Sequence, residues 1–387
     1  MKARSLLALL MITLAARSGA IGMGLSVKVI GGGLAGLATS YHLAQSGKCD
    51  RITVCDTSAS PGLGGASGVA AGLMHPFTPQ GKLIYLGLEG FEESEKLIKF
   101  AESSSNRLLS PSSARILRPC FTDKAMADWR KAASVHGDWV SEISVEEYTA
   151  NVGHSLRVED VPLGVFSLKN VHVIDSPAYL QALWAAIQTH YGESCSIEWE
   201  QVHVESIETE IDGKYDAVVV ASGAGVQQLW RSEEPLPFTY VRGQNLYYEL
   251  DEVESTSSLA GVLSGEYVCR AGQILVSGAT HEYGELDMLL AMPPDAEYAL
   301  NALAPKMDRL FPNLHGKKPI DCKAGIRVAS PRSHLGRLPV IAQHPDSSKA
   351  WLITGFGSRG LIHHAVFGKM LANAITGQEE LPAELGL

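Results

Sequence analysis

Apolar and polar positions in the N-terminal part of the chain indicate strands that alternate with a helix. An apolar run at residues 27–30 predicts a buried strand, and the Ala-rich stretch that follows a glycine-rich turn predicts a helix through Ala44. A second apolar run at 51–55 predicts the next strand, which ends on Asp56. Strand, helix and strand in this order are typical of a parallel sheet covered by helices.

Three later segments have the periodicity of helices. Residues 87–103 and 123–141 alternate polar and apolar positions with amphipathic spacing, and the charged side chains of the first form a solvated face. Residues 177–191 predict a third helix, with Ser176 as its N-cap and Pro177 in its first turn.

The rest of the chain mixes two patterns. The run Ala-Val-Val-Val at 217–220 is typical of a buried parallel strand, whereas the short runs beyond residue 239 suggest antiparallel strands. The remaining expected elements are strands at 197–207, 245–250, 267–270 and 274–276, a helix that opens at Pro293 and ends at Leu310, and a closing strand, turn and helix at 351–354, 355–360 and 361–375.

These patterns predict an α/β fold with a discontinuous, Rossmann-like dinucleotide-binding domain and a second α+β substrate domain built on an antiparallel sheet. The first domain is expected at residues 26–76, 170–228 and 322–387. The second is expected at 77–169 and 229–321. A ligand site is expected at their boundary.

The first turn carries a dinucleotide signature. Gly31, Gly33 and Gly36 form G-x-G-x-x-G between a strand and a helix, and Asp56 stands about 20 residues further on. Gly31 permits the tight turn, Gly33 allows backbone to approach a pyrophosphate, and Gly36 allows close packing of helix on strand. The helix N-terminus offers N–H groups to phosphates, and Asp56 is placed to accept hydrogen bonds from ribose hydroxyls.

Two further segments are rich in small residues. Residues 61–72 are almost free of bulky groups, so their backbone can lie flat against a ring system. Within them, Gly65, Ala66 and Ser67 offer N–H groups and a hydroxyl to a phosphate or a flavin edge. A plain flexible loop is the alternative. Residues 221–225 form a second strand-to-glycine turn that contains Ser222 and Gly223.

Composition narrows the class of protein. The chain has 387 residues, 45% of them hydrophobic and 19% charged, which is enough for two domains with substantial cores. A net charge of -10 does not suggest a protein that coats nucleic acid, although a local basic patch is compatible with it. Six cysteines form no C-x-x-C pair, so reduced thiols and no metal site are expected.

The first 25 residues have the character of a targeting leader. Lys2 and Arg4 precede an apolar run at 6–16, small residues follow, and no acid appears before Asp50. A secretory signal peptide fits this pattern better than an organelle presequence does, and the run is too short to span a bilayer. A plain extension of the first strand is the alternative reading.

Several motifs together resemble the FAD-dependent oxidoreductases of the D-amino-acid oxidase-like (DAO) superfamily. The matching segments follow the family's order along the whole chain after the leader: residues 29–36, 65–67, 222–224, 241–244, 325–327 and 355–361. The Gly-Ala-Ser-Gly loop with Pro76 after it and the ending Gly-Ser-Arg-Gly-Leu at 357–361 are similar in particular to the flavin module of the bacterial bifunctional tRNA 5-methylaminomethyl-2-thiouridine biosynthesis enzyme.

This resemblance implies FAD rather than NAD, and oxidation of a C–N bond. Some relatives attach FAD through a histidine near the small-residue loop, but the corresponding position here is Val69, so we expect non-covalent FAD. The residues expected to contact the cofactor are Gly31, Gly33, Leu34, Ala35, Gly36, Asp56, Gly65, Ala66, Ser67, Val204, Ser222, Gly223, Gly357, Ser358, Arg359, Gly360 and Leu361.

Three arginines are the candidate catalytic residues. Arg327, in Gly-Ile-Arg near the family's substrate arginine, has a guanidinium fork that matches a carboxylate, with a salt bridge as the alternative role. Arg359 faces either flavin or substrate, beside a helix start whose N–H groups stabilise negative charge on the flavin ring. Arg242 either adds positive charge to the pocket or holds the domain interface. Tyr247 and Tyr267 are candidates to cap the pocket, or core residues.

Two substrate classes remain open. The resemblance to the tRNA enzyme implies oxidation of a carboxymethylaminomethyl group on a wobble uridine, in which case the leader directs the protein to a plastid or mitochondrion. The acidic composition favours a small amino acid instead, such as glycine, sarcosine or a D-amino acid. A flavin-binding protein without turnover is a third alternative, and a secretory or cytoplasmic location stays open.

Overall fold

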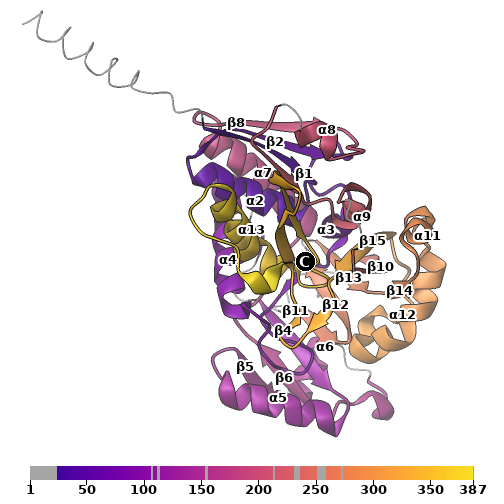
Figure 1. The fold of residues 1–387 in the computed structure, drawn as a ribbon. Helices are drawn as coiled ribbons and strands as arrows, with labels where there is room; N and C mark the ends of the chain where they lie inside the picture. The colour runs from indigo at the N-terminus through magenta and orange to yellow at the C-terminus, as the bar shows by residue number, and fades with distance from the viewer. Residues whose placement is uncertain are drawn as a thin grey trace, which may run out of the picture.

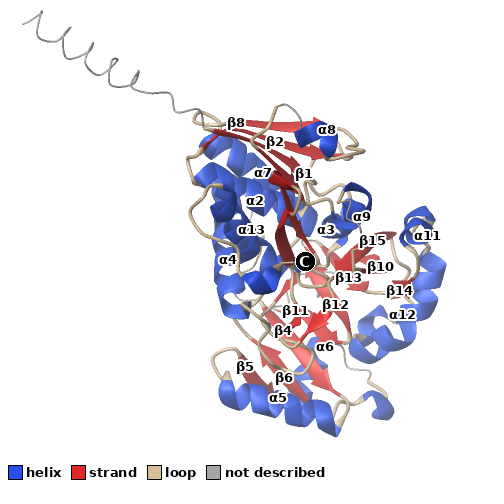
Figure 2. Ribbon diagram, in the orientation of Figure 1, coloured by secondary structure: helices blue, strands red, loops and turns tan. Residues whose placement is uncertain are grey.

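The computed structural model describes residues 24–105, 108–110, 114–152, 156–211, 214–230, 236–250, 259–271 and 273–386. Nearly all of the expected leader, residues 1–25, lies outside these ranges. Within the described ranges no helix combines the length and the apolar character that crossing a membrane requires. Two sheets organise the described part of the chain (Figures 1 and 2).

The first sheet has six strands in the order β18-β19-β9-β1-β2-β8. All neighbours pair in parallel except β18 with β19. Buried apolar side chains fill its central strands, as expected of a parallel sheet covered by helices. Its strands are β1 (Leu25–Ile30), β2 (Cys49–Asp56), β8 (Ser196–Gln201), β9 (Ala217–Val220), β18 (Val340–His344) and β19 (Ser347–Thr354).

Helices from both ends of the chain cover this sheet side by side. Helix α2 (Leu34–Gln45) packs against α13 (Gly360–Ile375), and α13 in turn packs against α4 (Gly87–Ser104). Gly368 makes this approach close, because a Cβ there would lie 2.9 Å from the Thr39 backbone nitrogen. Helix α7 (Ser176–Tyr191) contacts both α2 and α4. Helices α2 and α13, which follow the first glycine turn and the turn at 355–360, therefore lie in one layer, and this brings the two turns together.

The second sheet has nine strands, with the order β14-β10-β13-β12-β11-β4-β6-β5 and β15 paired to β10. Most of its pairs are antiparallel, and β4 with β11 is parallel. Its strands are β4 (Arg115–Cys120), β5 (Val140–Ile143), β6 (Gly164–Leu168), β10 (Thr239–Glu249), β11 (Leu259–Ser264), β12 (Glu266–Ala271), β13 (Ile274–Gly278), β14 (Glu282–Tyr283) and β15 (Asp321–Ala329).

Helices α5 (Asp123–Val135), α6 (Val145–Val152) and α12 (Ala296–Leu310) pack on this second sheet. The smaller elements are the strands β3 (Leu73–Met74), β7 (His172–Val173), β16 (Arg332–Ser333) and β17 (Gly336–Arg337), and the helices α3 (Gly65–Val69), α8 (Glu208–Ile211), α9 (Val226–Leu229) and α11 (Leu286–Ala291), with single 3-10 turns η1 (Val158–Asp160), η2 (Gly223–Gly225), η3 (Pro312–Leu314) and η4 (Ala383–Leu385).

The predicted fold class is confirmed, but several boundaries differ. Helix α5 ends at Val135, and β5 occupies the end of the helix expected at 123–141. Asp175, not Ser176, caps α7, because its carboxylate accepts a hydrogen bond from the Ala178 N–H at 3.2 Å. Strand β8 ends at Gln201 rather than residue 207, and α12 begins at Ala296 rather than at Pro293.

The position of strand β15 differs from the predicted domain boundaries, and this difference affects the site. Its residues were expected in the cofactor domain, yet it pairs along its length with β10 in the nine-stranded sheet. The small-residue loop lies against it, since a Cβ on Gly325 would come within 2.9 Å of the Ala66 Cα. The short helix α3 and strand β15 therefore join the two halves of the molecule.

Candidate active site

A cavity of about 550 Å³ lies where the glycine turns meet the nine-stranded sheet. One wall comes from the start of α2, from α3 and the segment after it, and from the start of α13. The opposite wall comes from β10, β11, β12 and β15 and from residues Ala279 and His281. Strand β4 reaches the same space through Arg118. The cavity is therefore built from segments that lie far apart in the sequence.

The first glycine turn has the geometry of a dinucleotide cradle. Gly31 has φ of +112°, and a Cβ on Gly36 would lie 1.8 Å from the Gly31 carbonyl oxygen, so both positions require glycine. Gly33, Leu34 and Ala35 line the cavity at the N-terminus of α2, whose first turn holds no acidic residue. An anionic pyrophosphate fits this helix end.

Other predicted cofactor residues divide between the cavity and its support. The lining includes Ala66, Ser67 and Gly223, and the Ser67 hydroxyl accepts a hydrogen bond from the Leu34 N–H at 3.2 Å. The Ser222 hydroxyl is buried without a hydrogen-bond partner among the described residues. Six of the predicted cofactor residues do not line the cavity: Gly31, Gly36, Asp56, Gly65, Val204 and Ser222.

Asp56 supports the turn from behind. One of its carboxylate oxygens accepts a hydrogen bond from the Gly32 N–H at 2.8 Å, and the other accepts from the Ser58 N–H at 2.8 Å. Val204 is buried in an apolar cluster with Val220. The structure therefore gives Asp56 a role in fixing the glycine turn, and the expected contact of Asp56 and Val204 with a cofactor stays a prediction.

The glycine turn before α13 directs a second helix N-terminus into the cavity. Gly357 has φ of +55°, and its N–H donates to the Val328 carbonyl at 2.7 Å, which ties the turn to β15. The predicted residues 357–361 all line the cavity, and the first turn of α13 has no acidic residue. This end of the cavity therefore suits a group that gains negative charge, such as a reduced flavin ring.

Arg327 extends from β15 over Gly243 into the cavity. A Cβ on Gly243 would lie 2.9 Å from the Arg327 Nη2, and that nitrogen donates a long 3.4 Å hydrogen bond to the Thr280 carbonyl. No carboxylate of the described residues pairs with Arg327, so its charge is available to a ligand. The salt bridge considered for it from the sequence is absent within that part of the chain.

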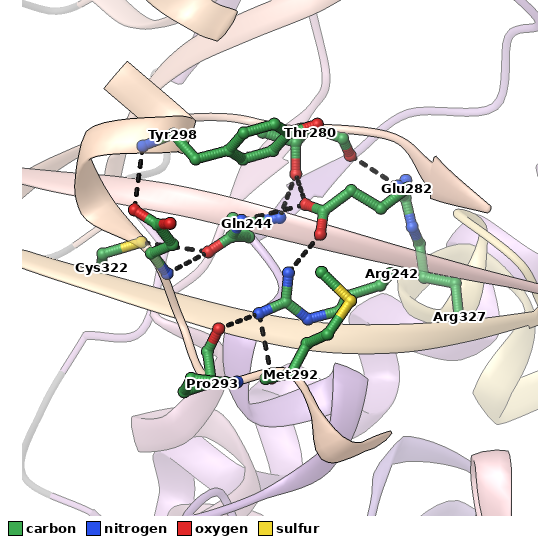
Figure 3. Close-up of polar contacts among 10 residues, drawn as sticks. Arg242, Gln244, Thr280, Glu282, Met292, Pro293, Tyr298, Cys322 and Arg327 are labelled. Carbon is green, nitrogen blue, oxygen red and sulfur yellow. Dashed lines mark hydrogen bonds and ion pairs between the residues drawn. The ribbon is translucent and has the colours of Figure 1, made fainter. Parts of the chain in front are cut away.

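Arg242, on the strand paired with β15, has the opposite environment (Figure 3). It is 1% exposed, forms an ion pair with Glu282, and donates to the carbonyls of Met292 and Pro293 at 3.1 and 2.6 Å. Glu282 also accepts hydrogen bonds from Gln244 and Thr280. Arg242 does not line the cavity, which corrects its assignment as a candidate catalytic residue: its charge is already neutralised within the fold.

The cavity lining is cationic. The described residues that line it include three arginines, Arg118, Arg327 and Arg359, and no Asp or Glu. Burial lowers the pKa of His75 to about 4, with the charge of Arg118 adding to the effect. Burial, followed by the charge of Arg327, lowers the pKa of His281. Both histidines are neutral at pH 7, so the arginines determine the charge and favour anionic ligands.

Sequence reasoning missed several lining residues. Asn245 accepts a hydrogen bond from the Tyr267 hydroxyl at 2.8 Å and donates to the Val69 carbonyl at 2.7 Å, so it links the sheet to the small-residue loop. Tyr267 lines the cavity, as considered, but Tyr247 does not. Arg118, Asn245 and His281 carry no motif, because only strand pairing brings them to the site.

The sequence from 26 to 374 matches the family described as DAO, FAD dependent oxidoreductase. A glycine oxidase from Pseudomonas putida is 26% identical over 93% of this chain and 96% of its own. A tRNA 5-methylaminomethyl-2-thiouridine biosynthesis bifunctional protein, MnmC, from Polaromonas naphthalenivorans is 24% identical over 92% of this chain, which spans only 57% of that relative.

Solved structures show the same fold. A glycine oxidase from Geobacillus kaustophilus superposes with a TM-score of 0.75, covering 94% of this chain and 98% of its own at 18% sequence identity. The predicted resemblance is thus confirmed, and so is the cofactor class. The two helix N-termini, the glycine turns and the acid-free lining of the cavity are consistent with FAD lying extended along the first wall.

Proposed function

Because the chain belongs to the DAO family of FAD-dependent oxidoreductases, we propose that it oxidises a C–N bond of an amine that carries a carboxylate. The observation that carries this proposal is the unpaired Arg327 guanidinium in a cavity whose described lining contains no acid. A carboxylate matches that fork bidentately, whereas a second cation would be repelled.

Bound FAD would supply a hydride acceptor for the C–H next to the amine nitrogen, and hydrolysis of the resulting imine would complete cleavage of the C–N bond. The protein's own residues hold the reactants in place. Arg327 orients the substrate carboxylate, and the N–H groups at the start of α13 stabilise negative charge that develops beside them. Gly33, Leu34 and Ala35 line the cavity and would hold the pyrophosphate, and Ser67 and Val69, which also line it, would border the flavin ring.

A basic hairpin favours tRNA as the source of the amine. Residues 324–345 contain no acid, and Arg332 and Arg337 lie opposite each other in the β16–β17 pair, both exposed. Arg359, which lines the cavity, donates to the Arg337 carbonyl at 3.4 Å, and burial followed by these two charges lowers its pKa. Like charges directly opposite are unfavourable unless an anion such as phosphate binds between them.

We therefore favour the carboxymethylaminomethyl group of a tRNA wobble uridine as substrate. The relative from Polaromonas naphthalenivorans is named for that pathway, although this chain matches only part of it. The alternative is a small amino acid, and similarity to the glycine oxidase of Pseudomonas putida supports it.

Anaerobic flavin reduction tests the function and separates the substrates. FAD-loaded protein is mixed with glycine, sarcosine, D-alanine, unmodified tRNA, or tRNA carrying the carboxymethylaminomethyl group. The flavin absorption band at about 450 nm, which is bleached on reduction, is then followed. We expect rapid bleaching with the modified tRNA alone. Bleaching by glycine or sarcosine instead supports the alternative, and no bleaching by any carboxylate-bearing amine contradicts the proposed function.

A further inference from the structure

Arg118 is a buried cation that the proposed chemistry does not use. It lies on β4, is 8% exposed, and lines the cavity. Its Nη1 donates to the Leu263 carbonyl at 3.3 Å and its Nη2 to the Pro79 carbonyl at 3.1 Å, while its guanidinium lies 4.8 Å from the centre of the Trp129 ring. These contacts fix the side chain at the edge of the cavity.

Among the residues that the structure describes, no carboxylate neutralises the charge of Arg118. Arg118 forms no ion pair with any acid of the described ranges, and the cavity beside it has no acidic lining residue there. Burial lowers the pKa of Arg118 to about 10, so the guanidinium remains charged at pH 7. A buried charge without a counterion is costly, which points to a ligand as the missing partner.

Arg242 shows what a purely structural arginine looks like in the same sheet. It is also buried, but the fold supplies Glu282 as a counterion and Gln244 and Thr280 to satisfy that carboxylate. Arg118 receives only neutral carbonyls and an aromatic face. Two hydrogen bonds to described residues also leave part of its five N–H donors free for a ligand.

The sheet order places Arg118 and Arg327 at opposite sides of the cavity. Four strands, β11, β12, β13 and β10, separate β4 from β15. These make five strand-to-strand spacings of about 4.8 Å, so the two backbones are on the order of 24 Å apart along the sheet. Both side chains line the cavity from these positions. A small amino acid with one carboxylate therefore contacts Arg327 without reaching Arg118.

We propose that Arg118 binds a second anionic group, a carboxylate or a phosphate, at the far end of an extended amine substrate. This inference rests on the proposed function, because Arg327 is taken to hold the first carboxylate beside the amine. It makes the preferred substrate a long dianion rather than glycine or sarcosine. A nucleotide that bears the amine on its base has the required second group.

Equilibrium binding of unreactive probes tests Arg118 without relying on turnover. Each probe carries a carboxymethoxy group, in which an ether oxygen replaces the amine, joined by a hexyl chain to a terminal group. One pair ends in a carboxylate or its amide, and the other in a phosphate or a hydroxyl. Dissociation constants are measured by calorimetry on FAD-loaded wild-type protein and on the Arg118→Met and Arg118→Lys variants.

In the wild type we expect the charged member of at least one pair to bind tenfold or more tightly than its neutral partner, as expected of a charge-assisted hydrogen bond. The ratio falls to near one in Arg118→Met and is partly retained in Arg118→Lys. Ratios within a pair cancel any general effect of the substitution on the fold. The more favoured pair identifies carboxylate or phosphate as the source of the charge.

Equal binding within both wild-type pairs overturns the proposal, as does a ratio that survives in Arg118→Met. The proposed function fails separately if no carboxylate-bearing amine of the panel, the modified tRNA included, reduces the flavin while the probes still bind with the expected ratios.

Discussion

The two walls of the cavity are built on different principles. The first wall is backbone: glycine turns, two helix N-termini and a loop of small residues, all within the segments that follow β1, β2 and β19. The second wall is side chains, which project from strands that are distant in sequence and adjacent only in the sheet. We infer that the first wall determines which cofactor binds and the second determines which substrate binds, so substitutions in them should have separable effects.

The largest effect is expected from the first wall, for Gly36→Ala. The added Cβ would lie 1.8 Å from the Gly31 carbonyl oxygen, so the turn and the start of α2 must shift. We expect no retained FAD and a fall of about 3 kcal/mol in the free energy of unfolding, measured by absorbance of the purified protein and by urea titration.

Gly225→Ala is the matched control. It also changes a glycine beside a nucleotide turn, but its φ is -68° and the nearest atom to a new Cβ is 3.5 Å away. It should retain FAD with little change in stability. Loss of FAD in both variants would indicate a general sensitivity rather than the close approach at Gly36.

The second wall gives a contrast between two arginines on paired strands. Arg242→Met leaves Glu282 buried without its counterion, which typically costs about 3–5 kcal/mol of stability. We expect a strongly lowered urea midpoint for this variant. An unchanged midpoint would show that Glu282 becomes protonated or hydrated at little cost.

Arg327→Met should behave in the opposite way. Arg327 has no ion partner in the described part of the chain, so its loss should leave the urea midpoint and FAD content nearly unchanged. Loss of a charge-assisted carboxylate contact should raise KM for the substrate by about 100-fold, at roughly 3 kcal/mol. Steady-state kinetics with the best amine of the panel measures this, and an unchanged KM would remove Arg327 from the site.

A smaller effect follows from histidines behind the first wall. Burial lowers the pKa of His42 and His363 to about 4 and that of His364 to about 3, all in α2 and α13. The unfolded chain therefore binds more protons below pH 6.5, so stability present at pH 7 is lost as the pH falls. At pH 5.5 the loss is about 1 kcal/mol per histidine.

We expect FAD release and unfolding to be promoted together between pH 7 and pH 5.5, as followed by flavin absorbance and urea titration. His364→Gln, which keeps a polar partner for Tyr179, should flatten this dependence by the share of one histidine. A stability that does not fall across this range would contradict neutral burial of the three rings.

The contrast between the two walls also explains which parts of the site the sequence could predict. The glycine turns were predictable because backbone geometry demands a residue type at fixed spacing, as at Gly31, Gly33 and Gly357. Arg118 and His281 were not predictable, because no local pattern indicates that β4 and the segment between β13 and β14 line the same cavity. Arg242 and Arg327 lie in comparable motifs, but the structure pairs Arg242 with the buried carboxylate of Glu282 and directs Arg327 into the cavity.

The boundary errors have physical causes as well. The expected helix at 123–141 contains Gly137, and the chain leaves the helix at His136, whose φ of -125° and ψ of 49° lie outside the helical region. The Asp175 carboxylate was a better N-cap than the Ser176 hydroxyl because it lies one residue before the helix begins.

The central claim is that bound FAD faces a cavity in which Arg327 receives a carboxylate. The most direct test is titration of FAD-loaded protein with glycolate, which has the carboxylate but no amine to oxidise, followed through the flavin absorbance spectrum. The account predicts a saturable spectral change in the wild type and none over the same range in Arg327→Met. Identical titrations in the two proteins would contradict it.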